Sequence, residues 1–199
     1  MVQRRERNPQ DGSGRHRLSA RDWADAALRA IGEGGLAAVA VEPLAARLGT
    51  TKGSFYWHFT NREALIEAAL HRWEEVGTED LITALAPEPD PLRRLRRLFA
   101  EATAAAARDP LELSLLATSA HPQVAAVLRR VTERRIGYIA GLFSELGFAP
   151  EEARRRGLLG YTAYLGHAQL AHAVRGALPA AADRAAYLDS VIDTLLSRD

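Results

Sequence analysis

Alanine dominates this sequence, with 38 of its 199 residues, and it has the highest helix propensity of the common amino acids. Valine, isoleucine and threonine, which favour strands, are sparse, and no segment alternates between apolar and polar residues as a half-buried strand does. Apolar residues recur instead at helical spacing, in segments separated by proline and glycine. The sequence therefore predicts an all-α fold.

Capping and breaking residues mark where the first helices begin and end. Ser19 and Asp22 form a capping-box pattern that predicts a helix start, and the glycine pair at 34–35 predicts its end. A short second helix is expected to start near Pro43 and to stop at Gly49. A short third helix is expected over about 52–58.

A longer fourth helix is expected after Thr60, which forms a second capping-box pattern with Glu63. It is predicted to run without interruption toward the prolines at 87, 89 and 91, where the sequence predicts a boundary or a tight elbow. Prolines and glycines then separate further helical segments. These are expected over 91–107, 110–119, 121–146, 151–176 and 183–197.

Composition narrows the class of protein. The sequence contains no cysteine, which excludes disulfides, thiolate metal sites and cysteine nucleophiles. Its first 17 residues are charged and lack the apolar core of a signal peptide. We therefore expect a folded, soluble protein located in the cytoplasm.

The formal charge of +1 hides an uneven distribution. Residues 1–62 carry ten basic and six acidic side chains, whereas residues 63–199 carry 16 basic and 19 acidic ones. Residues 1–17, rich in arginine, are expected to form a flexible basic arm. This distribution suggests that only the N-terminal part meets a polyanion.

One segment, 157–174, contains no charged residue, and its length is near the minimum for a membrane span. It also carries hydrogen-bonding side chains, among them Tyr161, Tyr164, His167 and His172, and two internal glycines. Such a helix is better placed between other protein helices than in lipid. A membrane-associated protein built around this segment is the less favoured alternative.

Residues 41–62 carry the clearest functional pattern. Two short helices joined by a tight turn need a small residue where they touch and a glycine at the turn, and Ala45 and Gly49 meet both needs. In the helix that follows, Phe55 and Phe59 lie about 40° apart and define its buried side. Trp57 then points outward, where the major groove of DNA would cover its apolar ring. The alternative is that Trp57 packs beneath another helix.

Residues 19–75 resemble the DNA-binding domain of TetR-family transcriptional regulators. The resemblance rests on LSARDWADAALRAIGEGG, LAARLG, TTKGSFYWHF and NREALIEAAL, in that order. It implies an N-terminal three-helix helix-turn-helix DNA-binding domain followed by a larger helical ligand-binding and dimerisation domain. The expected organisation is a flexible basic arm at 1–17, a helix-turn-helix domain at 18–62 and a ligand-binding and dimerisation domain at 63–199.

The same resemblance implies which residues lie at DNA. They are Thr51, Lys52, Gly53, Ser54, Tyr56, Trp57, His58 and Arg62. Arg62, at the start of the fourth helix, is expected to reach a phosphate. One residue departs from the family pattern: Ala40 stands where a threonine usually caps the second helix, which removes a cap worth about 1 kcal/mol and one phosphate contact.

The rest of the chain agrees with the family in length and helical character. The resemblance implies a homodimer formed through 151–176 and 183–197, with a roughly palindromic DNA operator. It also implies a cavity for an unknown small-molecule effector among the fourth to eighth helices. Candidate lining residues are Trp73, Phe99, Leu115, Tyr138, Tyr164 and His167, and their mixture suggests a largely apolar ligand with a few hydrogen-bonding groups.

No phosphate-binding glycine loop, nucleophile motif or metal-ligand motif is present in the sequence. His167 and His172 lie about 140° apart around a helix, so they do not chelate one ion. We therefore expect no catalytic residue, no cofactor and no metal site. The predicted function is a ligand-responsive transcriptional regulator, a repressor released by a small molecule. The alternative is a helical enzyme or small-molecule-binding protein with an appended helix-turn-helix head.

Overall fold

Throughout the residues that the computed structural model describes, 18–174, 176–180 and 182–198, every regular element is helical. The all-α prediction is confirmed for this part of the chain, and the expected basic arm at 1–17 lies outside it. In chain order the elements are α1 (Ala20–Gly34), the 3₁₀ turn η1 (Leu36–Ala38), α2 (Val41–Arg47), α3 (Lys52–Tyr56), α4 (Arg62–Glu74), the π-helical turn η2 (Glu75–Glu79), α5 (Asp80–Leu85), α6 (Pro91–Arg108), α7 (Leu111–Ala117), α8 (Pro122–Glu145), α9 (Pro150–Ala173) and α10 (Arg184–Leu196).

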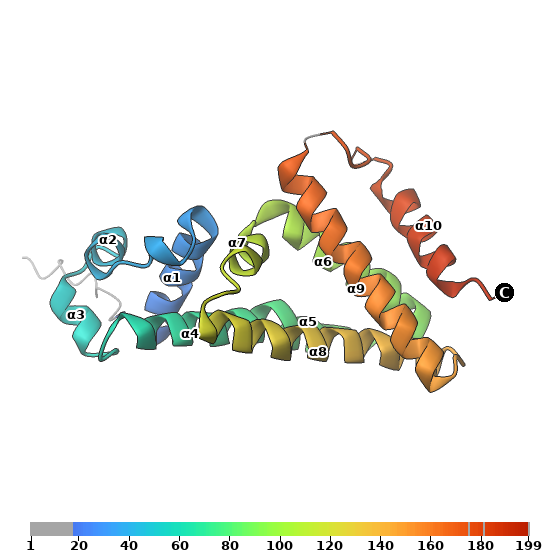
Figure 1. Cartoon of the computed structure of the whole chain (residues 1–199), viewed down its shortest axis with the longest axis horizontal. Coiled ribbons are helices and arrows are strands. Elements are labelled where there is room, and N and C mark those ends of the chain that lie inside the picture. The colour runs from blue at the N-terminus through green and yellow to red at the C-terminus, as the bar shows by residue number, and fades with distance from the viewer. Residues whose placement is uncertain (1–17, 175, 181, 199) are drawn as a thin grey trace, which may run out of the picture.

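The helices form an elongated molecule with a small head at one end (Figure 1). The head consists of α1, α2 and α3, and α4 leads away from it along the long axis. Helix α8 lies beside α4, η2 and α5, held in part by ion pairs from Arg130 to Glu74 and from Arg134 to Glu79. Helices α6 and α9 cross α8 and the segment beside it, and α10 is outermost. The continuous α4–η2–α5 segment therefore connects the head to the middle of the molecule.

Local sequence signals explain the boundaries of the head helices. Ser19 and Asp22 form the expected capping box at the start of α1, and Gly35 ends that helix with φ 69°. Gly49, with φ 64°, makes the turn between α2 and α3, a conformation that side chains with a Cβ rarely adopt. Ala40 occupies the N-cap of α2 without a side-chain hydrogen bond, as predicted.

Three differences from the sequence prediction concern α3 and the helix that follows it. Helix α3 ends at Tyr56, so it is shorter than the expected 52–58 segment. The N-cap of α4 is Asn61, whose side chain accepts the N–H of Ala64 at 2.8 Å, rather than Thr60. The expected uninterrupted fourth helix is broken by η2, which widens one turn between α4 and α5.

The described residues bury two apolar clusters. The first cluster contains buried side chains of α1, α2, α3 and α4, together with Leu111 and Leu115 of α7 and apolar side chains from the first half of α8. The second joins α6, the second half of α8, α9 and α10 around Phe99 and Phe143. The helix-turn-helix therefore shares its core with α7 and α8.

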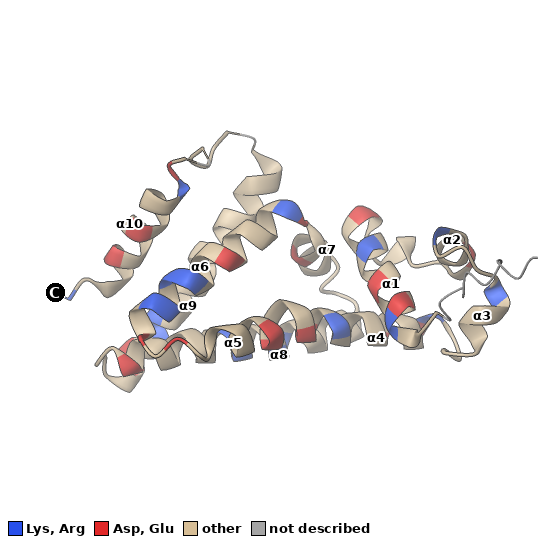
Figure 2. Cartoon of the chain, turned by 180° about the vertical axis from the view of Figure 1, so that it is seen from behind, with Lys and Arg blue, Asp and Glu red and all other residues tan. Residues whose placement is uncertain are grey.

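Helix α9 contains residues 157–173 of the uncharged segment, with Val174 as its C-cap, and so ends three residues before the predicted end at 176. Figure 2 shows the last turns of α9 without Lys, Arg, Asp or Glu. Its inner side is packed tightly: a Cβ added to Gly157 would stand 2.9 Å from the carbonyl oxygen of Ile136. Its outer side exposes Leu158, Leu159 and Leu170. Among the described helices, none combines the length and apolarity that crossing a membrane requires.

Candidate DNA-binding surface and ligand cavity

Helix α3 separates a buried side from an exposed one, as predicted. Phe55 is fully buried and Phe59 is 8% exposed, and the two rings stack with centroids 5.6 Å apart. The rings of Trp23 from α1 and Phe55 meet in a T-shaped contact with centroids 5.4 Å apart. Trp57 follows the helix with 81% of its surface exposed, so the prediction that its indole points outward is confirmed.

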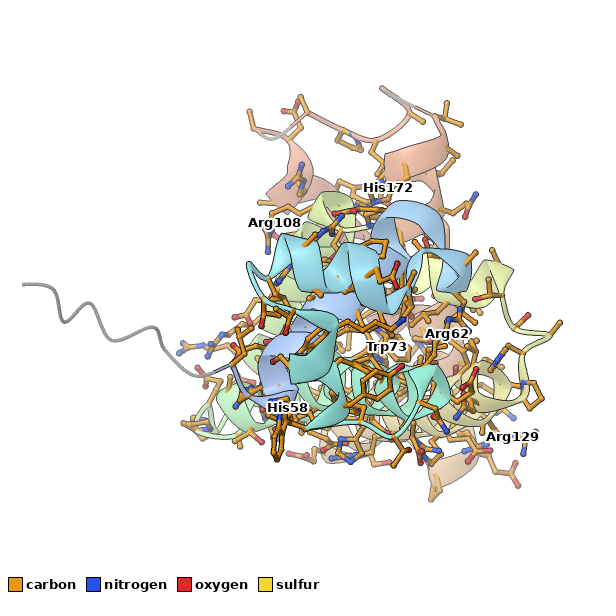
Figure 3. All side chains as sticks on the ribbon, turned by 90° about the vertical axis from the view of Figure 1, so that its left-hand side faces the viewer. His58, Arg62, Trp73, Arg108, Arg129 and His172 are labelled. Atoms are coloured by element: carbon orange, nitrogen blue, oxygen red, sulfur yellow. The ribbon has the colours of Figure 1, made fainter. Side chains whose placement is uncertain are left out.

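The other residues predicted to lie at DNA surround this indole. Thr51, Lys52 and Gly53 are exposed, and Tyr56 is 58% exposed, whereas Ser54 and His58 are half-buried. A Cβ on Gly53 would meet only the hydroxyl of Thr51 within 4 Å, so the backbone is open to a close approach on this side. Figure 3 views the molecule from the head and shows His58 at the lower edge of α3.

Two cations of the head are held in exposed ion pairs. The Lys52 ammonium donates to Glu42 at 2.9 Å, and the Arg47 guanidinium donates to both oxygens of Glu33 at 3.0 and 2.7 Å. The hydrogen bond from Lys52 lowers the pKa of Glu42, so this pair is charged at neutral pH. Exposed pairs of this kind are weak and open readily for a stronger anion.

The side chain of Arg62 is placed differently from the expectation. Its Nε donates to the carbonyl of Val39 at 2.7 Å, and a terminal nitrogen donates to the carbonyl of Leu36 at 2.5 Å. Arg62 therefore turns inward and ties the start of α4 to the η1 segment (Figure 3).

A cavity of about 800 Å³ lies between α1, the α4–η2–α5 segment, α6, α7, α8 and α9. Four of the six candidate ligand residues line it: Trp73, Phe99, Tyr138 and Tyr164. Leu115 and His167 do not lie on its walls. Leu115 is fully buried in the first cluster, and His167 is buried with its ring stacked on Tyr187 at 5.9 Å.

The alanine-rich stretch of α6 makes the space. Ala100, Ala102, Ala104, Ala105 and Ala106 all line the cavity. Because methyl groups leave room that longer side chains would occupy, this helix bounds a hollow rather than filling it. The surrounding walls are mostly apolar.

A buried ion pair also lines the cavity. Arg135 of α8 donates to both carboxylate oxygens of Glu112 on α7 at 2.8 and 2.9 Å. The Tyr164 hydroxyl donates to the same carboxylate at 2.7 Å and the Tyr161 hydroxyl at 3.3 Å. Burial and the negative charge of Glu112 raise the pKa of both tyrosines, so both hydroxyls stay protonated and act as donors.

Arg135 also holds the π-helical turn. Its Nε donates to the hydroxyl of Thr78 at 2.9 Å, and a terminal nitrogen donates to the carbonyl of Gly77 at 3.1 Å. The guanidinium lies over the ring of Trp73 at 5.3 Å. One buried arginine of α8 therefore joins α7 to the α4–η2–α5 segment, which leads to the head.

Sequence reasoning missed Glu112, Arg135 and Thr78. Charged residues in helical segments are usually solvated, and no local pattern marks these as buried. The signal that could have found one of them was the apolar surroundings of Glu112, which stands between leucines in LELSLL. Within the described part of the chain, no group of three histidine or acidic side chains could hold a metal ion.

Comparisons with known proteins agree with this arrangement. Residues 24–69 match the family model described as bacterial regulatory proteins, tetR family. The HTH-type transcriptional regulator TtgR of Pseudomonas putida is 35% identical over 78 residues, which cover 38% of this chain and 36% of TtgR. The match thus spans about a third of the length of that relative.

Solved structures share the fold over nearly the whole chain. A transcriptional regulator from Rhodococcus sp. Rha1 has a TM-score of 0.68 and 20% identity, covering 90% of this chain and 94% of that one. FadR from Bacillus subtilis in complex with stearoyl-CoA has a TM-score of 0.67 and 15% identity, covering 90% and 98%. These matches support a TetR-family regulator: residues 24–69 carry the sequence pattern of the family, and the solved structures share the fold of the chain.

Proposed function

We propose that this chain is a ligand-responsive repressor that binds a palindromic operator as a homodimer and is released by a small molecule. The observation that carries the proposal is the exposed Trp57 at the end of a helix whose opposite side is fully buried. An indole exposed to 81% leaves a large apolar surface in water unless a partner covers it. The major groove of DNA is a partner of the right size for this helix.

The groups around Trp57 suit DNA in character and position. Tyr56, His58 and Thr51 supply hydrogen-bonding groups for phosphates, which fix the register of a protein on the duplex. Gly53 leaves the backbone free to approach. Lys52 becomes available when its exposed pair with Glu42 opens toward a phosphate. Trp57 and Gly53 are then nearest the base edges.

The outer side of α9 supports a homodimer. Leu158, Leu159, Leu170 and Val174 are exposed along it, and Gly166 has no neighbour within 4 Å of an added Cβ. Small and apolar residues on an open helix face suit close packing against a second copy, together with α10. Two recognition helices related by two-fold symmetry would then read half-sites about 34–36 Å apart or at a multiple of that distance.

The α4–η2–α5 segment, which runs from the head to the cavity, supports a coupling between ligand binding and DNA binding. Helix α4 begins at Arg62 in the head and reaches the cavity at Trp73, and the adjoining η2 turn carries Gly77 and Thr78. Arg72 on the same helix pairs with Asp25 of α1 at 3.1 Å. A ligand that contacts this wall favours one position of α4 over another, and it shifts the head only by its difference in affinity for the two states.

A gel-shift titration with DNA from upstream of the gene tests the DNA-binding part. We expect Trp57→Ala and Lys52→Gln to weaken specific binding more than non-specific binding. Arg129→Gln removes an exposed charge from α8, remote from α3, and serves as the matched control (Figure 3). Equal specific affinity for the wild type and both α3 variants would refute this surface.

A further inference from the structure

The charged side chains around the cavity are unevenly paired. Its acidic residues are all engaged within the protein. Glu112 is held by Arg135 and two tyrosines, as described above. Asp25 pairs with Arg72 at 3.1 Å, and Glu101 with Arg97 at 2.6 Å. Asp109 accepts the backbone N–H of Leu111 at 2.9 Å.

Two arginines on the same cavity have no such partner. Arg29 and Arg108 both line it and are both exposed, and no described carboxylate lies within ion-pair distance of either. Glu33, one turn beyond Arg29, is taken by Arg47 at 2.7 Å. The opening therefore carries two exposed arginines that no ion pair holds, against one exposed carboxylate, Asp109, and both guanidinium groups are available to an anionic ligand group.

These two arginines belong to the same end of the cavity. An Oδ atom of Asp109, next to Arg108 in sequence, lies 3.2 Å from where a Cβ on Gly32 would stand. Arg29 precedes Gly32 by three residues, so it lies on the same side of α1. His172 of α9 also lies near this end of α6, with a ring nitrogen 2.6 Å from the carbonyl of Ala106. The end of α6, the last turns of α1 and the end of α9 thus meet around this opening.

The interior offers a different chemistry. Its walls are the alanines of α6 with side chains such as Leu81, Ile82 and Phe99. The buried charges of Glu112 and Arg135 satisfy each other, so neither is left for an ionic ligand group. Burying a second, unpaired charge there would be strongly unfavourable.

We propose that the ligand of this cavity is an amphiphile with one anionic end, a carboxylate or phosphate, held at Arg29 and Arg108, and an apolar body that lies along the alanines of α6. This inference rests on the proposed function, because it names the class of ligand for the same cavity. It excludes cationic amphiphiles, which would place a positive charge beside two unpaired arginines.

Displacement of the neutral dye N-phenyl-1-naphthylamine from the full chain tests the ligand class. The competitors are decanoate, decanol and decyltrimethylammonium, which share one alkyl chain and differ in charge, each below its micelle concentration. We expect decanoate to bind about fivefold more tightly than decanol, and decyltrimethylammonium to bind more weakly than both. Decanoyl-CoA serves as a second anionic competitor, and whichever anion binds more tightly identifies the free acid or the thioester as the source.

The matched variants are the doubles R29Q/R108Q and R129Q/R154Q. The first removes two charges from the cavity opening, and the second removes two from exposed positions on α8 and α9 that do not line the cavity. We expect the first to bring the three decyl compounds within about twofold of each other and the second to keep the preference. An unchanged preference in R29Q/R108Q, or tighter binding of the cation by the wild type, overturns the proposal.

The dye separates failure of this inference from failure of the proposed function. Dye binding that is lost in Ala104→Trp, a variant that fills the cavity, shows that the cavity takes apolar molecules whatever their charge. If the dye binds there but the anions show no advantage, the ligand class is wrong and the ligand-responsive function stands. If neither the dye nor any decyl compound binds to a protein that still binds its operator, both fall.

Discussion

The α3 surface and the cavity wall are built in opposite ways. The α3 surface is contiguous in sequence, from Thr51 to His58, and its exposed Trp57 contributes nothing to the core. The cavity wall draws on α1, α4, η2 and five further helices, and its buried Arg135 contacts α4, η2 and α7. The proposed DNA contacts can therefore be altered without loss of stability, whereas residues of the cavity wall serve the fold and the ligand together.

Of the substitutions considered, we expect replacement of the buried Arg135 on the cavity wall to lower stability the most. Arg135→Met leaves the Glu112 carboxylate buried with tyrosine donors alone, and we expect the free energy of unfolding in urea to fall by about 3–5 kcal/mol. Adding Glu112→Gln should restore most of that loss, because no buried charge remains. Arg134→Met, next in the chain but in an exposed pair with Glu79, should cost about 1 kcal/mol or less. Equal losses in R135M and R134M would contradict this assignment.

Replacement of the exposed Trp57 should affect operator binding without affecting stability. We expect Trp57→Ala to weaken operator binding by about 2 kcal/mol, near thirtyfold, while the free energy of unfolding changes by no more than about 0.5 kcal/mol. Fluorescence anisotropy with labelled operator and urea denaturation on the same preparation measure both quantities. Trp57→Phe should lose only part of the affinity. A large fall in stability would place the indole in the core and contradict the comparison.

The junction between the two regions begins with a helix cap. Asn61→Ala should lower the free energy of unfolding by about 1 kcal/mol, because the N–H of Ala64 loses its acceptor at the start of α4. Thr60→Ala, which removes the residue that the sequence pattern favours as the cap, should leave thermal stability close to that of the wild type. The reverse order of the two variants would assign the cap to Thr60.

The smallest expected effect lies in the exposed pair beside α3. Glu42→Gln frees Lys52 and removes a negative charge near the proposed phosphate positions, so operator affinity should rise by about two- to threefold. The gain should shrink as salt is added. Glu33→Gln, which frees Arg47 in the same way, is the natural comparison. An affinity that falls in E42Q would show that the pair orders α3 for binding.

The sequence predicts the head well because its signals are local. The capping box at Ser19, the glycines that end α1 and α2 and the outward position of Trp57 depend on neighbours a few residues apart. Helix α3 is shorter than its wheel implies, but the buried side defined by Phe55 and Phe59 is unchanged. Sequence periodicity is sufficient to predict whether a residue is buried or exposed where the face of a single helix determines it.

The cavity is less predictable because several helices decide it together. Periodicity marks Leu115 as inward-facing, but it does not say that this face meets the head core while Glu112, three residues earlier, meets the cavity. His167 was expected at the ligand and instead stacks on Tyr187 of α10. The η2 turn is invisible to a helix pattern, since Arg135, distant in sequence, holds its backbone.

Coupling between the cavity and α3 is the central claim, and one titration tests it most directly. Operator affinity is measured by anisotropy with and without a saturating amount of the decyl compound that best displaces the dye, for the wild type and for Ala104→Trp. We predict that the occupied wild type loses operator affinity by at least about fivefold and that the filled variant does not respond. Unchanged operator affinity in a wild-type sample whose dye is fully displaced would contradict the account.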